Sequence, residues 1–205
     1  MKYGVLSDVH GNLEAFQTAL HCLKQVGVDK YLFCGDLVGY GPDPEACVQQ
    51  YLQLANAGVA IGVLGNHDAI FIHPELQEYF NVDALLSLDW SAQHLSKTSI
   101  QAISYLPEIV QQKDFCMVHG TPRDPIKEYL FSSTQYHAFY SMWNGQILFV
   151  GHTHVPFFMQ GNEGVCHVRT IEKQQKLALQ PDFRYRLPIF FLIIRTGGRP
   201  LLLRP

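Results

Sequence analysis

The sequence predicts an α/β fold, because strand and helix patterns alternate over residues 1–70 and strand patterns dominate the second half. Its 205 residues suit one domain with a sizeable core, and 47% of them are hydrophobic. Alternating strands and helices favour a mainly parallel sheet built from right-handed crossovers. Ligands of such sheets bind beyond the carboxyl ends of the strands, so a functional site is expected there.

Three strands and two helices are predicted in the first part of the chain. The strands are the short apolar runs Lys2–Leu6, Tyr31–Cys34 and Val59–Leu64. Asn12 is a typical N-cap residue, and the apolar side chains after it repeat at helical spacing until Gly27. Asp43 and Pro44 suit the N-cap and first position of a second helix, which ends near Gly58.

The second part of the chain is predicted to be β-rich and antiparallel. It begins with two amphipathic helices, Val82–Ser96 and Ser99–Leu106. Turn residues then join strand-like runs into two hairpins, with a further single strand between them. These runs are Ile109–Gln111, Phe115–Val118, Ile147–Val150, Pro156–Gln160 and Val165–Arg169.

The last segment, Phe183–Pro205, differs in composition from the rest. It contains five arginines and no acidic residue. One interpretation is a basic surface tail around a last strand, Ile189–Ile194; the other is an altered reading frame that has replaced the native end. We therefore predict a single domain over residues 1–182, followed by an atypical Arg-rich segment over 183–205.

Net charge, cysteine content and hydropathy indicate which partners and which cellular compartment to expect. The net charge of −3 gives no argument for nucleic-acid or acidic-membrane binding. No apolar signal segment precedes the first strand, and the longest apolar run is far too short to span a bilayer. The five cysteines are dispersed and lack CxxC spacing, which predicts reduced thiols in a cytoplasmic protein.

Five short motifs rich in metal-binding side chains each follow a predicted strand. They are Asp8-Val9-His10, Gly35-Asp36, Gly65-Asn66-His67-Asp68, His119-Gly120 and Gly151-His152-Thr153-His154. Taken singly, each has an ordinary structural interpretation, such as a helix cap or a core histidine. Together they offer carboxylate, amide and imidazole ligands without thiolate, a set that favours Mn, Fe, Zn, Co or Ni over calcium.

Spacing within two of the motifs suggests how the ligands converge. Asp8 and His10 lie two residues apart, so on an extended segment both side chains would project to one side. His152 and His154 have the same spacing, and Gly151 would let the backbone approach the site closely.

In this order the motifs resemble those of the calcineurin-like metallophosphoesterase superfamily. The resemblance runs from Lys2 to about Phe158, and it is closest to the compact bacterial and archaeal phosphodiesterase branch. The runs that carry this closer likeness are Asp8–Asn12 and His119–Pro125. The resemblance implies a four-layer α/β/β/α sandwich, with two mixed sheets flanked by helices.

The resemblance also implies a role for each motif residue. One metal would be bound by Asp8, His10 and His154, and the other by Asn66, His119 and His152. Asp36 would bridge the two ions. His67 would be the catalytic residue, which protonates the leaving-group oxygen or steadies the phosphoryl group.

The implied activity is that of a metal-dependent phosphoesterase, above all a phosphodiesterase. A hydroxide bridging two divalent metal ions would attack phosphorus in line, without a covalent phosphoenzyme. The alternatives are a phosphomonoesterase or nucleotide hydrolase on the same site, and a non-catalytic scaffold with the same fold. The expected partner is a small phosphoester or nucleotide-type substrate. The segment Val82–Leu106 would cap the site, form a homo-oligomer contact, or simply pack on the sandwich.

The chain departs from the wider superfamily in one motif. Protein serine/threonine phosphatases carry Gly-Asp-x-Val-Asp-Arg-Gly, whereas the run Gly35–Gly41 lacks the second aspartate and the arginine. His67 therefore lacks that family's orienting carboxylate, which disfavours phosphoprotein substrates; Asp68 and Asp43 are the candidate replacements. Arg123 is either a phosphate contact or a solvated loop arginine.

Overall fold

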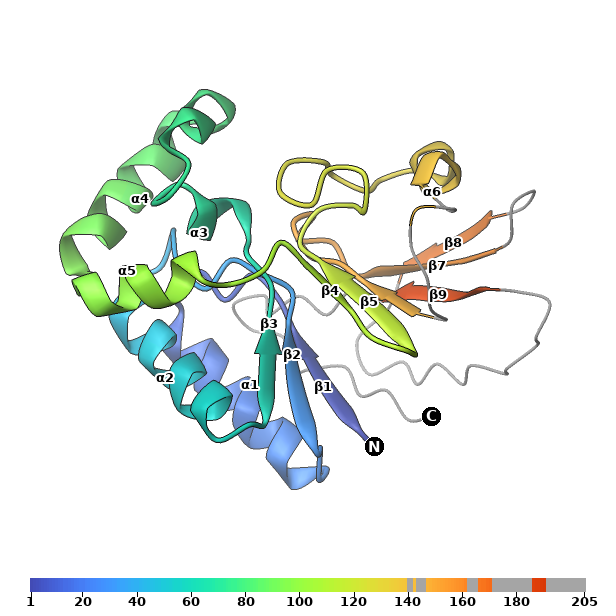
Figure 1. The fold of residues 1–205 in the computed structure, drawn as a ribbon, viewed down its shortest axis with the longest axis horizontal. Helices are drawn as coiled ribbons and strands as arrows, with labels where there is room; N and C mark the ends of the chain where they lie inside the picture. The colour runs from blue at the N-terminus through green and yellow to red at the C-terminus, as the bar shows by residue number, and fades with distance from the viewer. Residues whose placement is uncertain (140–141, 143–146, 162–165, 171–185, 191–205) are drawn as a thin grey trace.

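A computed structural model describes residues 1–139, 142, 147–161, 166–170 and 186–190. Over these residues the chain forms two β-sheets flanked by helices (Figure 1). The first sheet is entirely parallel, in the order β1-β2-β3. Its strands are β1 (Tyr3–Leu6), β2 (Lys30–Phe33) and β3 (Ala60–Gly62). The predicted parallel arrangement of the first three strands is therefore confirmed.

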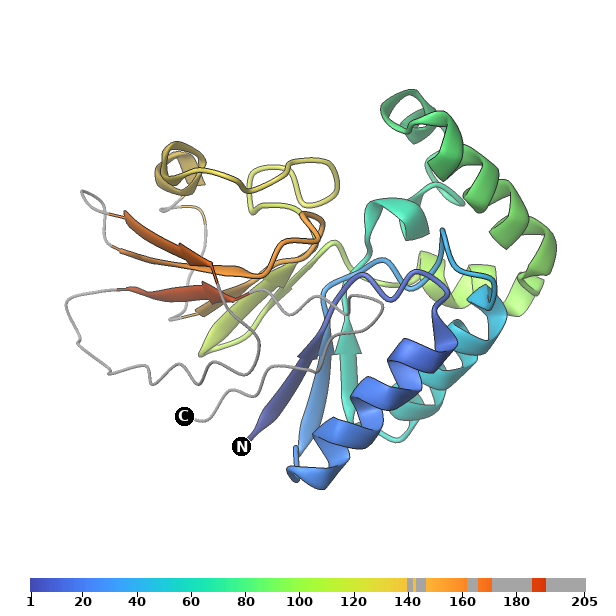
Figure 2. The same cartoon turned by 180° about the vertical axis from the view of Figure 1, so that it is seen from behind.

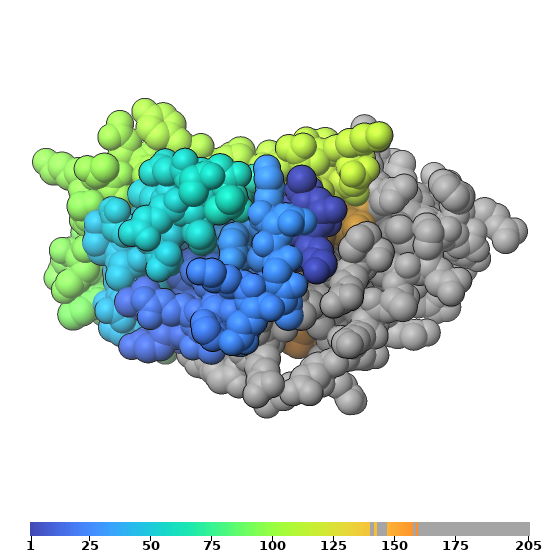
Figure 3. Space-filling view, turned by 90° about the horizontal axis from the view of Figure 1, so that it is seen from below, coloured from blue at the N-terminus to red at the C-terminus, as the bar shows by residue number. Residues whose placement is uncertain are grey.

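Two helices connect these strands and cover the outer face of the sheet, α1 (Leu13–Gln25) and α2 (Pro44–Asn56) (Figure 2). Asn12 caps α1 as predicted, since its side chain accepts a 3.0 Å hydrogen bond from the backbone of Ala15. Asp43 occupies the N-cap position of α2, but its side chain makes no capping hydrogen bond within the described chain. Pro44 alone favours the start of α2 there. Seen from below, α1 and α2 form part of the blue-to-cyan surface (Figure 3).

A second group of helices lies between the two sheets in sequence. It comprises α3 (Asn66–Ala69), η1 (Pro74–Tyr79), α4 (Val82–His94) and α5 (Lys97–Ser104). The two predicted amphipathic helices correspond to α4 and α5. Sequence patterns predicted neither α3 nor η1, nor α6 (Ser133–Phe139) later in the chain, because none of them is long enough to show helical periodicity. No helix in the described residues is both long and apolar enough to cross a membrane.

The second sheet is mixed, in the order β4-β5-β6-β9-β7-β8. Its strands are β4 (Ile109–Gln111), β5 (Phe115–Val118), β6 (Ile147–Phe149), β7 (Phe157–Gly161), β8 (Cys166–Thr170) and β9 (Arg186–Phe190). Both predicted hairpins are present as antiparallel pairs. The expectation of an antiparallel second half is wrong, however, because β6 pairs in parallel with both β5 and β9. The long connection from β5 to β6 makes this crossover feasible.

The Arg-rich segment contributes the strand β9 to the interior of this sheet, between β6 and β7. The predicted strand began later, at Ile189, and residues 191–194 of that prediction lie outside the described chain. The register of β7 and β9 shifts between Met159 and Gly161, opposite the stretch that contains Pro188. Proline cannot donate to a strand ladder, which accounts for an irregularity at this place.

Alternate residues of β5 pack on opposite sides of the second sheet. Phe115 and Met117 join the larger core with residues of the first sheet, and the ring of Tyr3 lies 5.4 Å from that of Phe115. Cys116 and Val118 face a second core that includes residues of α6. The two sheets thus pack on each other with helices outside; the complete four-layer arrangement stays a prediction.

Candidate metal centre

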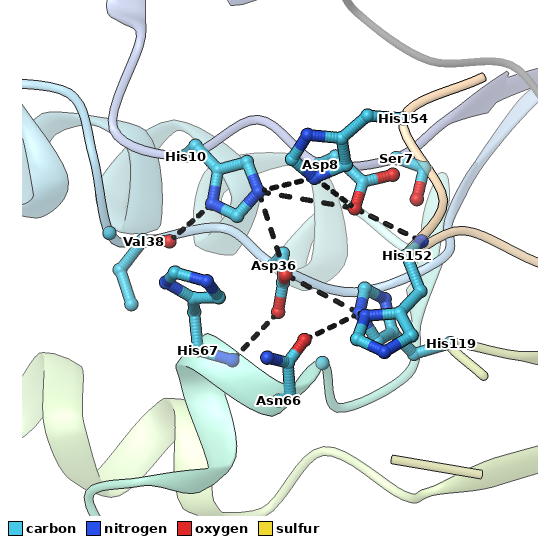
Figure 4. Close-up of polar contacts among 12 residues, drawn as sticks. Ser7, Asp8, His10, Asp36, Val38, Asn66, His67, His119, His152 and His154 are labelled. Carbon is cyan, nitrogen blue, oxygen red and sulfur yellow. Dashed lines mark hydrogen bonds and ion pairs between the residues drawn. The ribbon is translucent and has the colours of Figure 1, made fainter. Parts of the chain in front are cut away.

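All seven predicted ligands and His67 lie together beyond the carboxyl ends of the strands (Figure 4). They come from the segments that follow β1, β2, β3, β5 and β6. Most of these side chains are buried; His154 and Asn66 are partly exposed. Parallel strands bring their carboxyl ends to one edge, which is why residues so distant in sequence converge.

The first ligand group consists of Asp8, His10, Asp36 and His154. The Nε2 atoms of His10 and His154 lie 3.0 Å apart, and His154 Nε2 lies 3.3 Å from Asp8 Oδ1. His10 Nε2 also lies 3.6 Å from Asp36 Oδ2. Asp8 Oδ2 is buried without a hydrogen-bond partner among the described residues. Inward-facing nitrogens beside a buried, unpartnered carboxylate oxygen are what a cation site requires.

The second ligand group shares Asp36 with the first and adds His119 and His152. His119 Nε2 lies 3.3 Å from Asp36 Oδ2, 2.9 Å from Asn66 Oδ1 and 3.1 Å from His152 Nδ1. Asp36 Oδ2 therefore lies within 3.6 Å of a histidine of each group. This is the position a bridging carboxylate would occupy.

Hydrogen bonds to backbone carbonyls select which nitrogen of each histidine faces the site. His10 Nδ1 lies 3.0 Å from the carbonyl of Val38, and His119 Nδ1 lies 2.7 Å from that of Cys34. A carbonyl only accepts, so each Nδ1 carries the proton and leaves the Nε2 lone pair for a metal. His152 is reversed: its Nε2 donates to the carbonyl of Lys127 at 3.1 Å, which leaves Nδ1 free to ligate.

The electrostatics of the cluster favour charged carboxylates. Burial alone would raise the pKa of Asp36, but His119 and His67 outweigh it and hold that pKa well below its ordinary value. Burial would also raise the pKa of Asp8, but its hydrogen bond with His154 and the charges of His119 and His10 together lower that pKa below its ordinary value. Burial would lower the pKa of His119, but the charge and hydrogen bond of Asp36, together with the charge of Asp8, raise it to about 9. In the absence of metal, histidine protons thus balance carboxylate charges that cations would otherwise balance.

Five of the seven ligands have a left-handed backbone, which corrects the expectation of extended segments. Their φ angles lie between 51° and 70°, in a region costing non-glycine residues on the order of 1 kcal/mol or more each. These residues are Asp8, His10, Asp36, His152 and His154. Gly151 confirms the expected close approach, because a Cβ there would lie 2.1 Å from Ser7 Oγ. Local strain and close contacts thus accompany the assembly of the site.

His67 is held mainly by neighbouring rings. Its backbone N–H donates to Asp36 Oδ1 at 2.9 Å, and its ring packs against those of His10, Tyr40 and Phe80 at 4.6–4.9 Å. Its buried Nδ1 has no hydrogen-bond partner in the described residues. Burial lowers the pKa of His67 to about 3, so the imidazole is neutral at neutral pH.

Asp68 does not take the place of the missing orienting carboxylate. Its oxygens accept hydrogen bonds from the backbone of Leu37, Val38 and Gly65 at 3.0–3.3 Å. Asp68 therefore anchors the loop after β2 to the start of α3. Its pKa is raised to about 7, first by burial and then by the charge of Asp36.

Sequence reasoning missed the aromatic residues that border the site. The ring of Tyr40 lies 4.8 Å from that of His10, and the ring of Tyr129 stacks on His152 at 3.6 Å. Neither tyrosine belongs to a ligand motif, so only their positions just after motif loops could have signalled them. Arg123, considered as a phosphate contact, is instead exposed and pairs with Glu128.

Comparisons with known proteins identify the family of the chain. The model of the calcineurin-like phosphoesterase family matches residues 1–157. The uncharacterized protein MJ0912 of Methanocaldococcus jannaschii is 32% identical over 186 residues, which cover 88% of this chain and 72% of that protein.

Solved structures show the same likeness. A metallophosphoesterase from Sphaerobacter thermophilus has a TM-score of 0.73 and 28% identity, covering 97% of this chain and 77% of that one. A putative diadenosine tetraphosphatase has a TM-score of 0.50 and 25% identity, covering 74% and 75%. With a family match over most of its length and the ligand motifs gathered in one place, the chain belongs to the calcineurin-like phosphoesterase family.

Proposed function

We propose that the protein is a phosphodiesterase that works with two divalent metal ions. The observation that carries the proposal is the position of Asp36, whose buried carboxylate is shared by two groups of ligands. A single cation would need only one group. Two neighbouring cation positions joined by a carboxylate are the arrangement that favours in-line displacement at phosphorus.

The residues present fit such ions. Asp8, His10 and His154 would hold one, and Asn66, His119 and His152 the other. Imidazole and oxygen ligands without thiolate suit Mn, Fe, Zn, Ni or Co. When bound, the two ions would activate water as a nucleophile and neutralise charge on the phosphoryl oxygens.

The chain's own contribution to the chemistry is positional. Carbonyls of Val38, Cys34 and Lys127 orient the three histidine rings, so the nitrogens that would bind metal already face the site before any ion arrives. His67 borders the first ligand group and is neutral, so it would donate a hydrogen bond to a phosphoryl or leaving-group oxygen. Leaving-group protonation would require a bound phosphoester to raise the low pKa of His67.

We propose a small phosphodiester as the substrate and the cytoplasm as the location. The free cysteines Cys22, Cys34, Cys47 and Cys116 support a reducing compartment. A nucleotide hydrolase is the second candidate, because one structural relative is a putative diadenosine tetraphosphatase.

A metal-reconstitution assay tests the proposal. Metal-free protein would receive Mn, Ni, Zn or Mg and be assayed against bis-p-nitrophenyl phosphate and p-nitrophenyl phosphate. We expect metal-dependent hydrolysis of the diester, lost in Asp36→Asn and retained in Asp29→Asn, whose carboxylate binds the backbone of Lys2 instead. Preference for the monoester would favour a phosphatase. Folded protein that binds two ions without any turnover would be a scaffold.

A further inference from the structure

Two aromatic groups border the metal centre at different ligands. Tyr40 packs against His10 and His67, next to the first ligand group. Tyr129 stacks on His152 of the second group with ring centroids 3.6 Å apart and an interplanar angle of 18°. Phe131 extends this stack, with its ring 5.4 Å from that of Tyr129 and only 6° from parallel. Each ligand group therefore has its own aromatic neighbour.

These rings are unusually exposed for side chains packed against a buried site. Tyr40 is 51% exposed, Tyr129 45% and Phe131 61%. Part of each side chain is therefore open to a bound molecule.

Tyr40 is kept in this place at a cost in backbone energy. Its φ of 57° lies in the left-handed region, which disfavours a bulky aromatic residue. Hydrogen bonds on both sides fix the turn: Gly39 N–H donates to Ser91 Oγ at 3.3 Å, and Gly41 N–H donates to the carbonyl of His10 at 2.8 Å. Glycine would suit this backbone better, so the strain points to a use for the ring.

The backbone that carries the Tyr129–Phe131 stack is also held by hydrogen bonds. Gln135, on α6, donates to the carbonyl of Tyr129 at 2.6 Å and accepts from the backbone N–H of Phe131 at 2.9 Å. Both aromatic groups thus stand on immobilised backbone, so a ligand ring that stacks on them would not have to order a loop.

We propose that Tyr40 and the Tyr129–Phe131 stack are two walls that receive the two ester groups of a diester with flat aromatic substituents, such as aryl rings or nucleobases. This inference rests on the proposed function and adds the substrate class. Tyr40 adjoins His67 and so takes the leaving group; the stack beside His152 takes the group that stays on phosphorus. A monoester has one ester group and leaves one wall unused.

Two chromogenic diesters with the same leaving group test the assignment on the metal-loaded protein. They are bis-p-nitrophenyl phosphate and methyl p-nitrophenyl phosphate, which differ only in the retained group. Phe131→Ala is expected to lower kcat/KM for the first about fivefold, mainly through KM, and for the second by less than about twofold. Tyr40→Ala should lower both alike, and Tyr40→Phe should restore both.

Tyr105→Ala is the matched control, because Tyr105 is an exposed tyrosine at the end of α5 and should affect neither substrate. Equal effects of Phe131→Ala on both diesters, or no effect, would overturn the assignment. Calorimetry that compares the binding of diphenyl phosphate with that of dimethyl phosphate tests the aromatic walls separately from the proposed phosphodiesterase activity. Preferential binding of the diphenyl ester that weakens in Phe131→Ala supports the walls even without turnover, whereas equal binding of both esters rejects them.

Discussion

At the scale of single residues, Gly39 shows how one backbone position fixes a functional side chain. Its φ is +88°, and a Cβ there would lie 2.2 Å from His67 Nδ1. Gly39→Ala must therefore displace the His67 ring. We expect a fall in kcat of about tenfold or more, because misplacement of a reacting group by about 1 Å is already costly.

Gly58→Ala is the control for that substitution. Gly58 also has a positive φ, +72°, but nothing lies within 4 Å of the added Cβ. Both alanines carry a left-handed strain of roughly 1 kcal/mol, and only one meets His67. Steady-state kinetics should show normal kcat for Gly58→Ala; a similar loss in both variants would mean that strain alone is responsible.

Replacing His67 itself should separate chemistry from metal binding. Its ring is not among the two ligand groups, so His67→Ala should keep its full metal content. We expect kcat to fall by about 10²-fold or more, the usual contribution of a positioned proton or hydrogen-bond donor. Metal analysis of the purified variant checks the first part, and loss of an ion would assign His67 to the ligands.

At this scale, the gathering of the candidate ligands in one place could be predicted, but their backbone conformation could not. Asp8, Asp36 and His152 were predicted from donor chemistry and their place after strands. Their left-handed backbones depend on contacts such as the hydrogen bond from His152 N–H to Asp8 Oδ1, which joins residues distant in sequence. Tyr129 was missed because only the fold places it against His152.

At the scale of elements, Glu45 ties the start of α2 to the start of α5. Its carboxylate accepts hydrogen bonds from Ser96 N–H at 2.9 Å and from Ser99 Oγ at 3.0 Å. Burial would raise the pKa of Glu45, but these bonds outweigh it and lower the pKa below its ordinary 4.5. Such a group stabilises the fold above pH 4.5, and this contribution is lost as pH falls through the lowered pKa.

Glu45→Gln should therefore lower the free energy of unfolding by about 1 kcal/mol at pH 7 and by less near pH 3. Urea unfolding at the two pH values measures the difference. Glu108→Gln, at an exposed position before β4, should change neither value. A Glu45→Gln deficit that grows toward low pH would contradict the assigned hydrogen bonds.

Predictability also differs among elements. α1 and α4 were predicted because each runs for 13 residues with an amphipathic pattern, and Asn12 also marked the start of α1. α3 has only four residues and forms where Asp68 binds the backbone of Gly65, so it has no periodic signal. The parallel pairing of β5 with β6 follows from the course of the intervening chain rather than from the strand sequences.

At the scale of the whole molecule, the site joins the two sheets, because its ligands follow strands of both. Metal ions would link these parts and bind only the folded chain. We expect saturating Mn²⁺ to raise the Tm on the order of 5–10 °C over metal-free protein. Differential scanning calorimetry measures this, and Asp36→Asn should show a smaller rise. An equal rise in both would place the stabilising ions elsewhere.

The most direct test of the central claim is a titration of metal-free protein with Mn²⁺ in which bound ions and hydrolysis of bis-p-nitrophenyl phosphate are measured together. The shared position of Asp36 predicts that activity rises until two ions are bound per chain and then levels off. Full activity with one ion bound, or no hydrolysis with two, would contradict a dinuclear phosphodiesterase.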